Sequence, residues 1–369
     1  MSLTYKKEKE DGPLSFAIVP SRSSRRIYYL DVLRVVACMA VVMIHASAPY
    51  LGKDIGSFNF WVGNVLDSLS RVAVPLFVMI SGALMLDEKY VYTAEKLKKH
   101  IMKLAIFFVF WSAFYTLVFG IIANVAKGDP LDVADIILNF IKGHYHLWFV
   151  YLIIGLYLIL PLLRLWVKKA NKKYVWYFIE LSMIFAFVLP QIIEIGSYYC
   201  DDFDVLKSLE NKVAVHYAYG YTIYFVLGWY LNNFVLKNKK MVYYMGIIGA
   251  FATIMGTYIL SITTGQALQM YSNFGLNVLL QSVAIFVFIK NRFSRETANE
   301  KEIVKVISKY SLGIYAIHAL IIEVAHLVLN NVDFDVAIIV IPIVFVSAFS
   351  ISLLMSFIAS RMPLLKKVL

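Results

Sequence analysis

The sequence predicts an all-α, polytopic membrane protein with about ten transmembrane helices and both termini in the cytoplasm. Its 369 residues are 60% hydrophobic and 16% charged, with a mean hydropathy of +0.71. Soluble domains carry roughly 25% charged residues. Apolar runs of about 20 residues, the length that crosses a bilayer, recur along the whole chain. The distribution of basic residues then orients these spans.

Ten apolar runs are long enough to span a membrane. In chain order they cover residues 28–50, 59–86, 101–124, 147–167, 174–195, 216–236, 241–262, 273–290, 310–330 and 335–358. The second run contains several polar residues, so part of it is expected outside the hydrocarbon, and Pro75 is expected to kink it. This body, residues 28–358, is predicted to lie between an N-terminal tail, 1–27, and a C-terminal tail, 359–369.

The basic residues are strongly asymmetric across these spans. Of the 35 lysines and arginines, 28 fall on the side of the two termini, 6 on the other side, and Arg34 lies within the first span. Loops rich in Lys and Arg stay in the cytoplasm, so both tails are predicted to be cytoplasmic. The net charge of +11 then reflects topology and contact with anionic membrane lipids rather than nucleic acid. We expect the protein in the plasma (inner) membrane.

The first run carries two polar residues on one face. Arg34 and His45 are eleven residues apart, which is about 20° past three full helical turns and about 16 Å along the axis. Cys38 falls on the same stripe, and Asp31 is placed to pair with Arg34 at i,i+3. Snorkelling to the headgroups is the alternative role for Arg34, and a packing hydrogen bond is the alternative for His45. Their shared face favours a functional pair. No metal-ligand spacing is present, so no metal is expected.

Other spans place polar residues at matching levels. Arg71 is predicted near the outer side, at the level of His45, unless it is only an interfacial anchor. His144 and His146 precede Trp148 at the outer interface, where an aromatic belt is the alternative explanation. Their i,i+2 spacing would put the two imidazoles on different sides of a helix.

The ninth span adds further candidates. Tyr310 and Ser311 are predicted at its inner end, His318 in the middle of the bilayer and Glu323 farther out. Polar groups within a bilayer are costly and are functional candidates by default. A hydrogen bond inside the bundle is the structural alternative for each.

Four stretches together resemble membrane acyltransferase family 3. They are Arg-x10-His from Arg34 to His45, R-x3-P-x-F-x3-SG from Arg71 to Gly82, HLWF opening the fourth span, and YSLGIYxIH in the ninth. The resemblance covers essentially residues 28–358 and implies transfer of acyl groups, mostly acetyl, from coenzyme A to hydroxyls of extracytoplasmic glycans. Without an SGNH hydrolase-like domain after the last span, the chain resembles the standalone bacterial O-acetyltransferases.

The resemblance also implies roles for individual residues. Arg34 would bind the acetyl-CoA donor, His45 would act as general base on the acceptor hydroxyl, and Arg71 would stabilise the oxyanion or orient an anionic acceptor. A His45 acyl-imidazole and acyl transfer through Cys38 stay open. The candidate site residues are, for catalysis, His45, Arg34 and Arg71, and, for substrate binding, Asp31, Ser81, His146, Trp148, Tyr310, Ser311 and His318.

Other function classes fit the same composition. A proton-coupled secondary transporter or exporter would also embed His, Arg and Glu in ten spans, although such proteins commonly have two matching halves and none is evident here. A non-catalytic partner in glycan assembly is a third reading. The acceptor would be selected by external loops, predicted at 51–58, 125–145 and 196–215, which supply Tyr198, Tyr199, Asp201, Asp202 and Asp204. No recognisable code in them names the acceptor.

Overall fold

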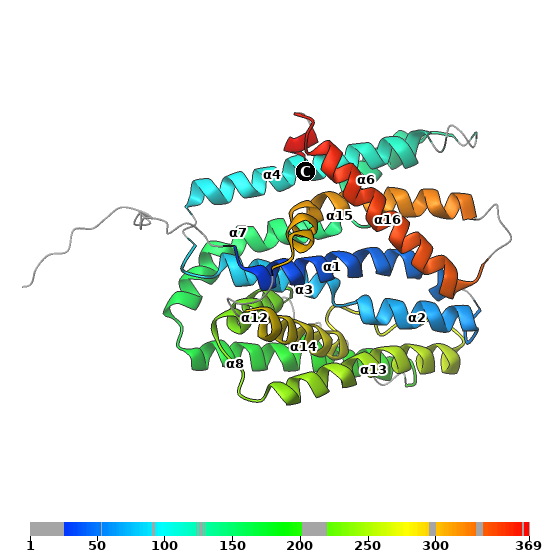
Figure 1. The fold of residues 1–369 in the computed structure, drawn as a ribbon. Helices are drawn as coiled ribbons and strands as arrows, with labels where there is room; N and C mark the ends of the chain where they lie inside the picture. Colours follow the sequence, from blue (N-terminus) through cyan, green and yellow to red (C-terminus); the bar gives the residue numbers. More distant parts are fainter. Residues whose placement is uncertain are drawn as a thin grey trace, which may run out of the picture.

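The protein is a bundle of long helices that run roughly alongside one another (Figure 1). The structure, a computed structural model, describes residues 26–52, 54–90, 93–122, 124, 128, 130–200, 220–294, 300–329, 335–363 and 365–368. Within these residues there is no strand. The predicted all-α class is therefore confirmed.

Thirteen α-helices and four shorter 3-10 or π segments make up the described chain. In order they are α1 (Tyr28–Ser47), η1 (Ala48–Gly52), α2 (Phe58–Ser70), α3 (Ala73–Met85), α4 (Ala94–Tyr115), η2 (Thr116–Ile122), α6 (Val133–Lys142), α7 (Trp148–Lys169), α8 (Lys172–Ser182), η3 (Met183–Val188), α9 (Leu189–Ser197), α12 (Thr222–Asn233), α13 (Lys239–Thr264), α14 (Leu276–Phe293), α15 (Glu302–Leu329), α16 (Ala337–Ala359) and η4 (Leu365–Lys367).

Nine helical segments of the described chain are long and apolar enough to cross a membrane. They match nine of the ten predicted spans, with α2–α3 and α8–η3–α9 each forming one segment. The remaining predicted span, 216–236, contains α12, whose 12 residues follow a part of the chain outside the described residues. Large apolar side chains such as Leu162, Phe251 and Ile247 are exposed on the bundle surface, as lipid-facing residues are. The chain is a polytopic membrane protein.

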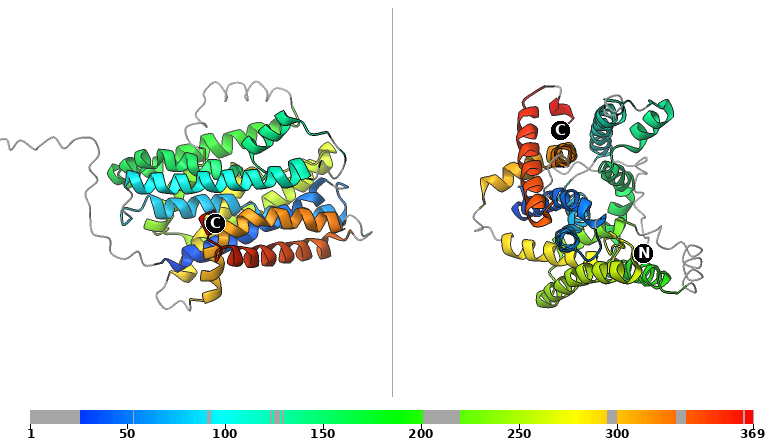
Figure 2. Two further views of the ribbon diagram at one scale, coloured as in Figure 1. Left: turned by 90° about the horizontal axis from the view of Figure 1, so that it is seen from above. Right: turned by 90° about the vertical axis from the view of Figure 1, so that its right-hand side faces the viewer.

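Helix α1 lies in the middle of the bundle. It packs against α15 and α16 on one side and against α2, α3 and α14 on others. The view along the bundle shows α1 between the α15–α16 pair and the α13–α14 pair (Figure 2, right). Its side chains therefore reach partners from several parts of the chain.

Two glycines bring α3 and α12 unusually close together. A Cβ at Gly82 would overlap the carbonyl oxygen of Phe225, and a Cβ at Gly228 would overlap the carbonyl oxygen of Met79. The two helices thus pack backbone to backbone, which only small residues permit in a membrane bundle.

The second span is broken shortly before Pro75, the residue expected to kink it. The helix stops at Ser70, residues 71–72 form a turn, and α3 restarts at Ala73. Pro75 then lies in the first turn of α3, where the missing amide proton costs no helical hydrogen bond. Consequently Arg71 lies at a helix break and not within a continuous helix.

Residues 133–142, predicted within an external loop, form the amphipathic helix α6. This helix folds back along α4 and η2, and the Ser112 hydroxyl donates to the carbonyl oxygen of Phe140 at 2.5 Å. Gly143 has a φ of +73°, a conformation that reverses the chain before α7. As a result, the turn before α7 packs on the bundle, where His146 contacts Tyr315 and His318 of α15.

Candidate active site

A seam between α1 and α15 brings together most of the predicted polar residues. The two helices lie side by side, and three pairs face each other in constant register. The Arg34 guanidinium donates to the Ser308 hydroxyl at 2.9 Å, and the Cys38 sulfur is 4.0 Å from the Ser311 carbonyl oxygen. The rings of His45 and His318 lie 5.2 Å apart between centroids. Arg34 and His45 therefore share one face of α1, as predicted.

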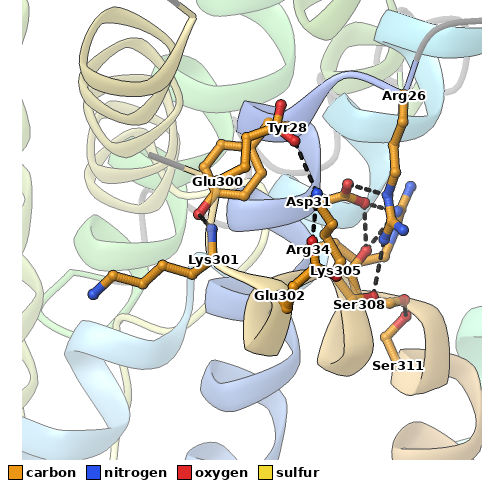
Figure 3. A network of polar contacts seen from close by, with 10 residues as sticks. All are labelled: Arg26, Tyr28, Asp31, Arg34, Glu300, Lys301, Glu302, Lys305, Ser308 and Ser311. Carbon is orange, nitrogen blue, oxygen red and sulfur yellow. Dashed lines mark hydrogen bonds and ion pairs between the residues drawn. The ribbon is translucent and has the colours of Figure 1, made fainter. Parts of the chain in front are cut away.

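One end of the seam is a charged cluster of Arg26, Asp31, Arg34 and Ser308, here named the Asp31 cluster (Figure 3). The buried Asp31 carboxylate accepts from Arg26 at 2.5 Å, from Ser308 at 2.6 Å and from Arg34 at 3.1 Å. The Asp31–Arg34 pair was predicted from spacing and is confirmed. Two guanidinium groups share one carboxylate, so the cluster keeps a net positive charge. The Arg34 side chain is 27% exposed and remains open to an anionic ligand.

The other end of the seam is the histidine cluster, formed by His45, His144, His146 and His318. His318 and His146 have ring centroids 5.2 Å apart, and the Tyr145 ring packs on His45 at 4.9 Å. His318 is fully buried and His146 is 2% exposed. By helix rise, His45 lies about 16 Å from Arg34.

The two histidines before α7 contact each other, contrary to the sequence prediction. His144 Nδ1 and His146 Nδ1 are 3.0 Å apart. The prediction assumed a helical i,i+2 arrangement, whereas these residues form a turn before α7. Burial lowers the pKa of His144 to about 4, and burial together with neighbouring histidines lowers the pKa of His146 below its ordinary value. Both imidazoles are therefore neutral near pH 7.

The histidine cluster contains buried ring nitrogens without a hydrogen-bond partner among the described residues. The two groups nearest His318 Nδ1 are the carbonyl oxygens of Ile314 and Tyr315, at 3.1 and 2.8 Å, so this nitrogen carries the proton. His318 Nε2 and His146 Nε2 are buried and have no hydrogen-bond partner among the described residues. Within the same residues no hydrogen bond to the His45 ring is found, and the ring is only partly buried. A buried acceptor without a donor is costly, which is typical of functional groups awaiting a ligand.

Arg71 is held by an arrangement that we name the arginine clamp, consisting of Asp67, Arg71 and Tyr271. Arg71 forms an ion pair with the fully buried Asp67, and its guanidinium carbon lies 4.1 Å from the centre of the Tyr271 ring. The Tyr271 hydroxyl donates to Asn64 at 2.7 Å, and the Ser47 hydroxyl donates to Asp67 at 3.3 Å. Arg71 lies close enough for its charge to act on His45. Its side chain nevertheless remains 21% exposed.

The other predicted substrate-binding residues divide between the seam and elsewhere. Ser311 lies buried in the seam and donates to the Ser308 carbonyl oxygen at 3.0 Å. Ser81 donates to Phe77 on its own helix at 2.9 Å, and no hydrogen bond among the described residues joins it to either cluster. Tyr310 packs on Phe357 of α16, away from the seam.

Trp148 lies apart from both clusters. The predicted external loop 196–215 is described only as far as residue 200. Trp148 is 41% exposed and contacts Phe149 and Tyr221. The Tyr199 hydroxyl bonds with Thr263 of α13 at 3.1 Å. Asp201, Asp202 and Asp204 lie outside the described residues.

Several residues of these clusters were not predicted. Asp67 precedes Arg71 by four residues, so the i,i+4 rule could have paired them. Ser308 lies three residues before Ser311 and could have been added to the same face of α15. Tyr271 and Tyr145 gave no such signal, because a tyrosine in a membrane protein is expected at an interface.

Taken together, the helical bundle and its buried polar seam define a polytopic membrane protein with a candidate site inside the bundle. A family model described as an acyltransferase domain matches residues 27–360, nearly the whole described bundle. The chain therefore belongs to membrane acyltransferase family 3 and is an acyltransferase, and the match to this one domain fits the standalone form. No match was found among curated proteins or among solved structures.

Proposed function

We propose that the protein moves an acyl group, acetyl in the first instance, from cytoplasmic acyl-CoA to a hydroxyl of an extracytoplasmic glycan or glycolipid. In this proposal it lies in the plasma membrane, with both tails, 1–27 and 359–369, in the cytoplasm. The carrying observation is that Arg34 and His45, at the two ends of one face of α1, both face α15. A donor bound at one end and a base at the other match a reaction whose substrates come from opposite sides.

The Asp31 cluster would receive the donor. The pyrophosphate of acyl-CoA is a multiply charged acceptor, and the planar Arg34 guanidinium offers it a fork of N–H donors. The pantetheine arm then runs along the seam toward His45. The about 16 Å rise between the two residues is on the order of the length of this arm.

His45 would act as general base at the other end. A neutral imidazole takes the proton of the acceptor hydroxyl while the hydroxyl oxygen attacks the thioester carbonyl carbon. The tetrahedral adduct then collapses, the carbon–sulfur bond breaks, and the coenzyme A thiolate takes a proton from the imidazolium.

Arg71 would supply positive charge where the oxyanion develops. Asp67 and Tyr271 hold the guanidinium before any substrate arrives, so little reorganisation is needed during the reaction. Their hold is compatible with this role because the Arg71 side chain stays partly exposed.

The test uses purified protein in lipid nanodiscs with acetyl-CoA and an extract of envelope glycans. We expect free coenzyme A to appear with time, together with glycans heavier by one acetyl group in mass spectrometry. His45→Ala protein of equal monodispersity serves as the blank. Coenzyme A release that is equal in the two samples would refute the proposal, whereas movement of a glycan or metabolite across vesicles without acetylation would favour the transporter reading.

A further inference from the structure

An open pocket lies beside the histidine cluster and shares His144 with it. It has a volume of about 420 Å³ and lies between the end of α4, η2, α6 and the turn before α7. Its lining residues are Tyr115, Thr116, Phe119, Gly120, Asn124, Asn139, Gly143, His144 and Tyr145. Sites for small ligands commonly measure about 300–1,000 Å³.

Three rings form a continuous stack on the wall of this pocket. His144 stacks on Tyr115 with centroids 4.3 Å apart and on Phe119 at 5.3 Å, and Tyr115 stacks on Phe119 at 5.9 Å. Tyr115 is fixed from behind, since its hydroxyl donates to the Ala316 carbonyl oxygen at 2.7 Å. Tyr115 is only 2% exposed, so the rings of this stack that a ligand can reach are those of His144 and Phe119. A rigid aromatic surface of this kind packs against the apolar face of a sugar ring.

The other polar side chains that line the pocket are uncharged and can both donate and accept hydrogen bonds. Asn124 and Asn139 each offer an amide that both donates and accepts, and Thr116 adds a hydroxyl. This set suits sugar hydroxyls, which also donate and accept. None of the lining residues is Lys, Arg, Asp or Glu, and His144 is neutral near pH 7. Burial raises the pKa of Tyr145, and the negative charge of Glu323 on α15 raises it further. The same negative charge disfavours an anionic ligand in the pocket.

The pocket adjoins the proposed base. Tyr145 lines it, and the same ring packs on His45. We propose that this pocket is an acceptor subsite that binds one uncharged sugar ring on the partly exposed rings of Phe119 and His144 and so places the attached part of the acceptor beside His45. This inference rests on the proposed function and adds to it that the bound sugar is neutral and not a uronic, sialic or phosphorylated one.

A binding measurement tests the subsite apart from catalysis. Methyl glucoside and methyl glucuronide, which share a ring and differ in a carboxylate, are presented to the protein in nanodiscs, and binding is followed by saturation-transfer NMR. We expect a signal from methyl glucoside and at least a tenfold weaker one from methyl glucuronide, about the effect of one unpaired charge. Equal binding of both, or binding of neither, overturns the proposal.

Variants locate the binding. A Cβ at Gly120 would meet only Thr116 and Asn139 at ordinary distances, so Gly120→Leu is expected to fold and to fill the pocket. It should abolish the methyl glucoside signal, whereas Gly155→Leu, whose Cβ meets no atom within 4 Å, should keep it. Asn139→Ala and Phe119→Leu are milder changes, each expected to weaken binding by about tenfold. Unchanged binding in all three pocket variants overturns the proposal.

The outcome separates this inference from the proposed function. The same proteins are assayed for coenzyme A release with envelope glycans. If sugar binding follows the variants but no acetylation occurs in any protein, the subsite stands and the proposed function fails. If acetylation proceeds and the pocket variants match the wild type in binding and in rate, the function stands and the subsite fails.

Discussion

His45 and His318 face each other across two helices that run side by side, with ring centroids 5.2 Å apart. Ten residues earlier on α15, Ser308 contacts Arg34, which lies eleven residues before His45 on α1. The two contacts show that one face of α1 is matched by one face of α15 over the length of the proposed reaction path. The predictions below test the parts of this path separately.

Removing the imidazole at position 45 should remove catalysis without removing the fold. We expect His45→Gln to lower kcat by about 10²–10⁴-fold, the usual contribution of a general base, with little change in KM for acetyl-CoA. Coenzyme A release measures the rate, and size-exclusion chromatography measures the fold. His100→Gln, at the exposed start of α4, is the matched control and should retain full activity. A His45→Gln rate within a factor of about three of the wild type would refute the role.

The Asp31 cluster should govern the donor and not the chemical step. Arg34→Ala is expected to raise KM for acetyl-CoA by about 10–100-fold, because charge-assisted hydrogen bonds are lost. Arg34→Lys should recover part of this loss, since it keeps the charge but not the fork. Arg361→Ala, exposed beyond α16, is the control. If Arg34→Ala reduces only the yield of folded protein, Arg34 has a structural role.

Asp67 should act on the rate through Arg71. Asp67→Asn leaves the packing volume but removes the ion pair, so Arg71 loses the partner that orients it. We expect kcat to fall by about tenfold or more while KM for acetyl-CoA stays unchanged. Glu180→Gln, an exposed carboxylate on α8, controls for the loss of one negative charge. A rise in KM with an unchanged kcat would place Arg71 with the donor instead.

The crossing of α3 and α12 should tolerate no side chain larger than hydrogen at Gly228. Gly228→Ala forces the Cβ against the Met79 carbonyl oxygen, and we expect a loss of about 1–3 kcal/mol in stability, as for other overpacked cores. Thermal unfolding in detergent measures it. Gly155→Ala in α7 meets no atom within 4 Å and should leave the melting temperature the same or slightly higher. Equal melting temperatures for the two variants would contradict the close approach.

The turn before α7 should make the fold sensitive to acid. The His144 pKa is lowered by burial to about 4 in the folded protein, against an ordinary value of 6.5. Between these values the unfolded chain binds the proton and the folded one does not, so stability is complete above pH 6.5 and is lost as the pH falls toward 4. After allowance for partial exposure, about 1–2 kcal/mol should be lost by pH 4.5. His144→Gln should flatten the profile of melting temperature against pH in this window. A profile identical to that of the wild type would contradict the lowered pKa.

Hydropathy and helix period predicted the spans and the shared face of Arg34 and His45, because both depend on spacing along one helix. The same reasoning missed α6, since ten residues folded back onto α4 do not form a run long enough to span a bilayer. It also separated His144 from His146, because a turn was treated as a helix. Pro75 predicted a kink in the second span, and residues 71–72, just before it, form a turn that divides the span into two helices.

Partners that come from distant parts of the chain could not be predicted. Tyr271 reaches Arg71 from the connection between α13 and α14, and Ser308 reaches Arg34 from the neighbouring helix α15. Such contacts depend on how helices cross, which is set by close approaches such as that of Gly82 and Gly228. No local pattern in the sequence specifies those crossings.

The constant register of the α1–α15 seam has a kinetic consequence. A slip of one helical turn, about 5.4 Å, would separate Arg34 from Ser308, Cys38 from Ser311 and His45 from His318 at once. These two helices are therefore expected to stay together as a rigid strip through every turnover. Loading of reactants and escape of products would then depend on movements of the surrounding helices, so turnover could be slowed by cross-linking those helices while the strip itself stays intact.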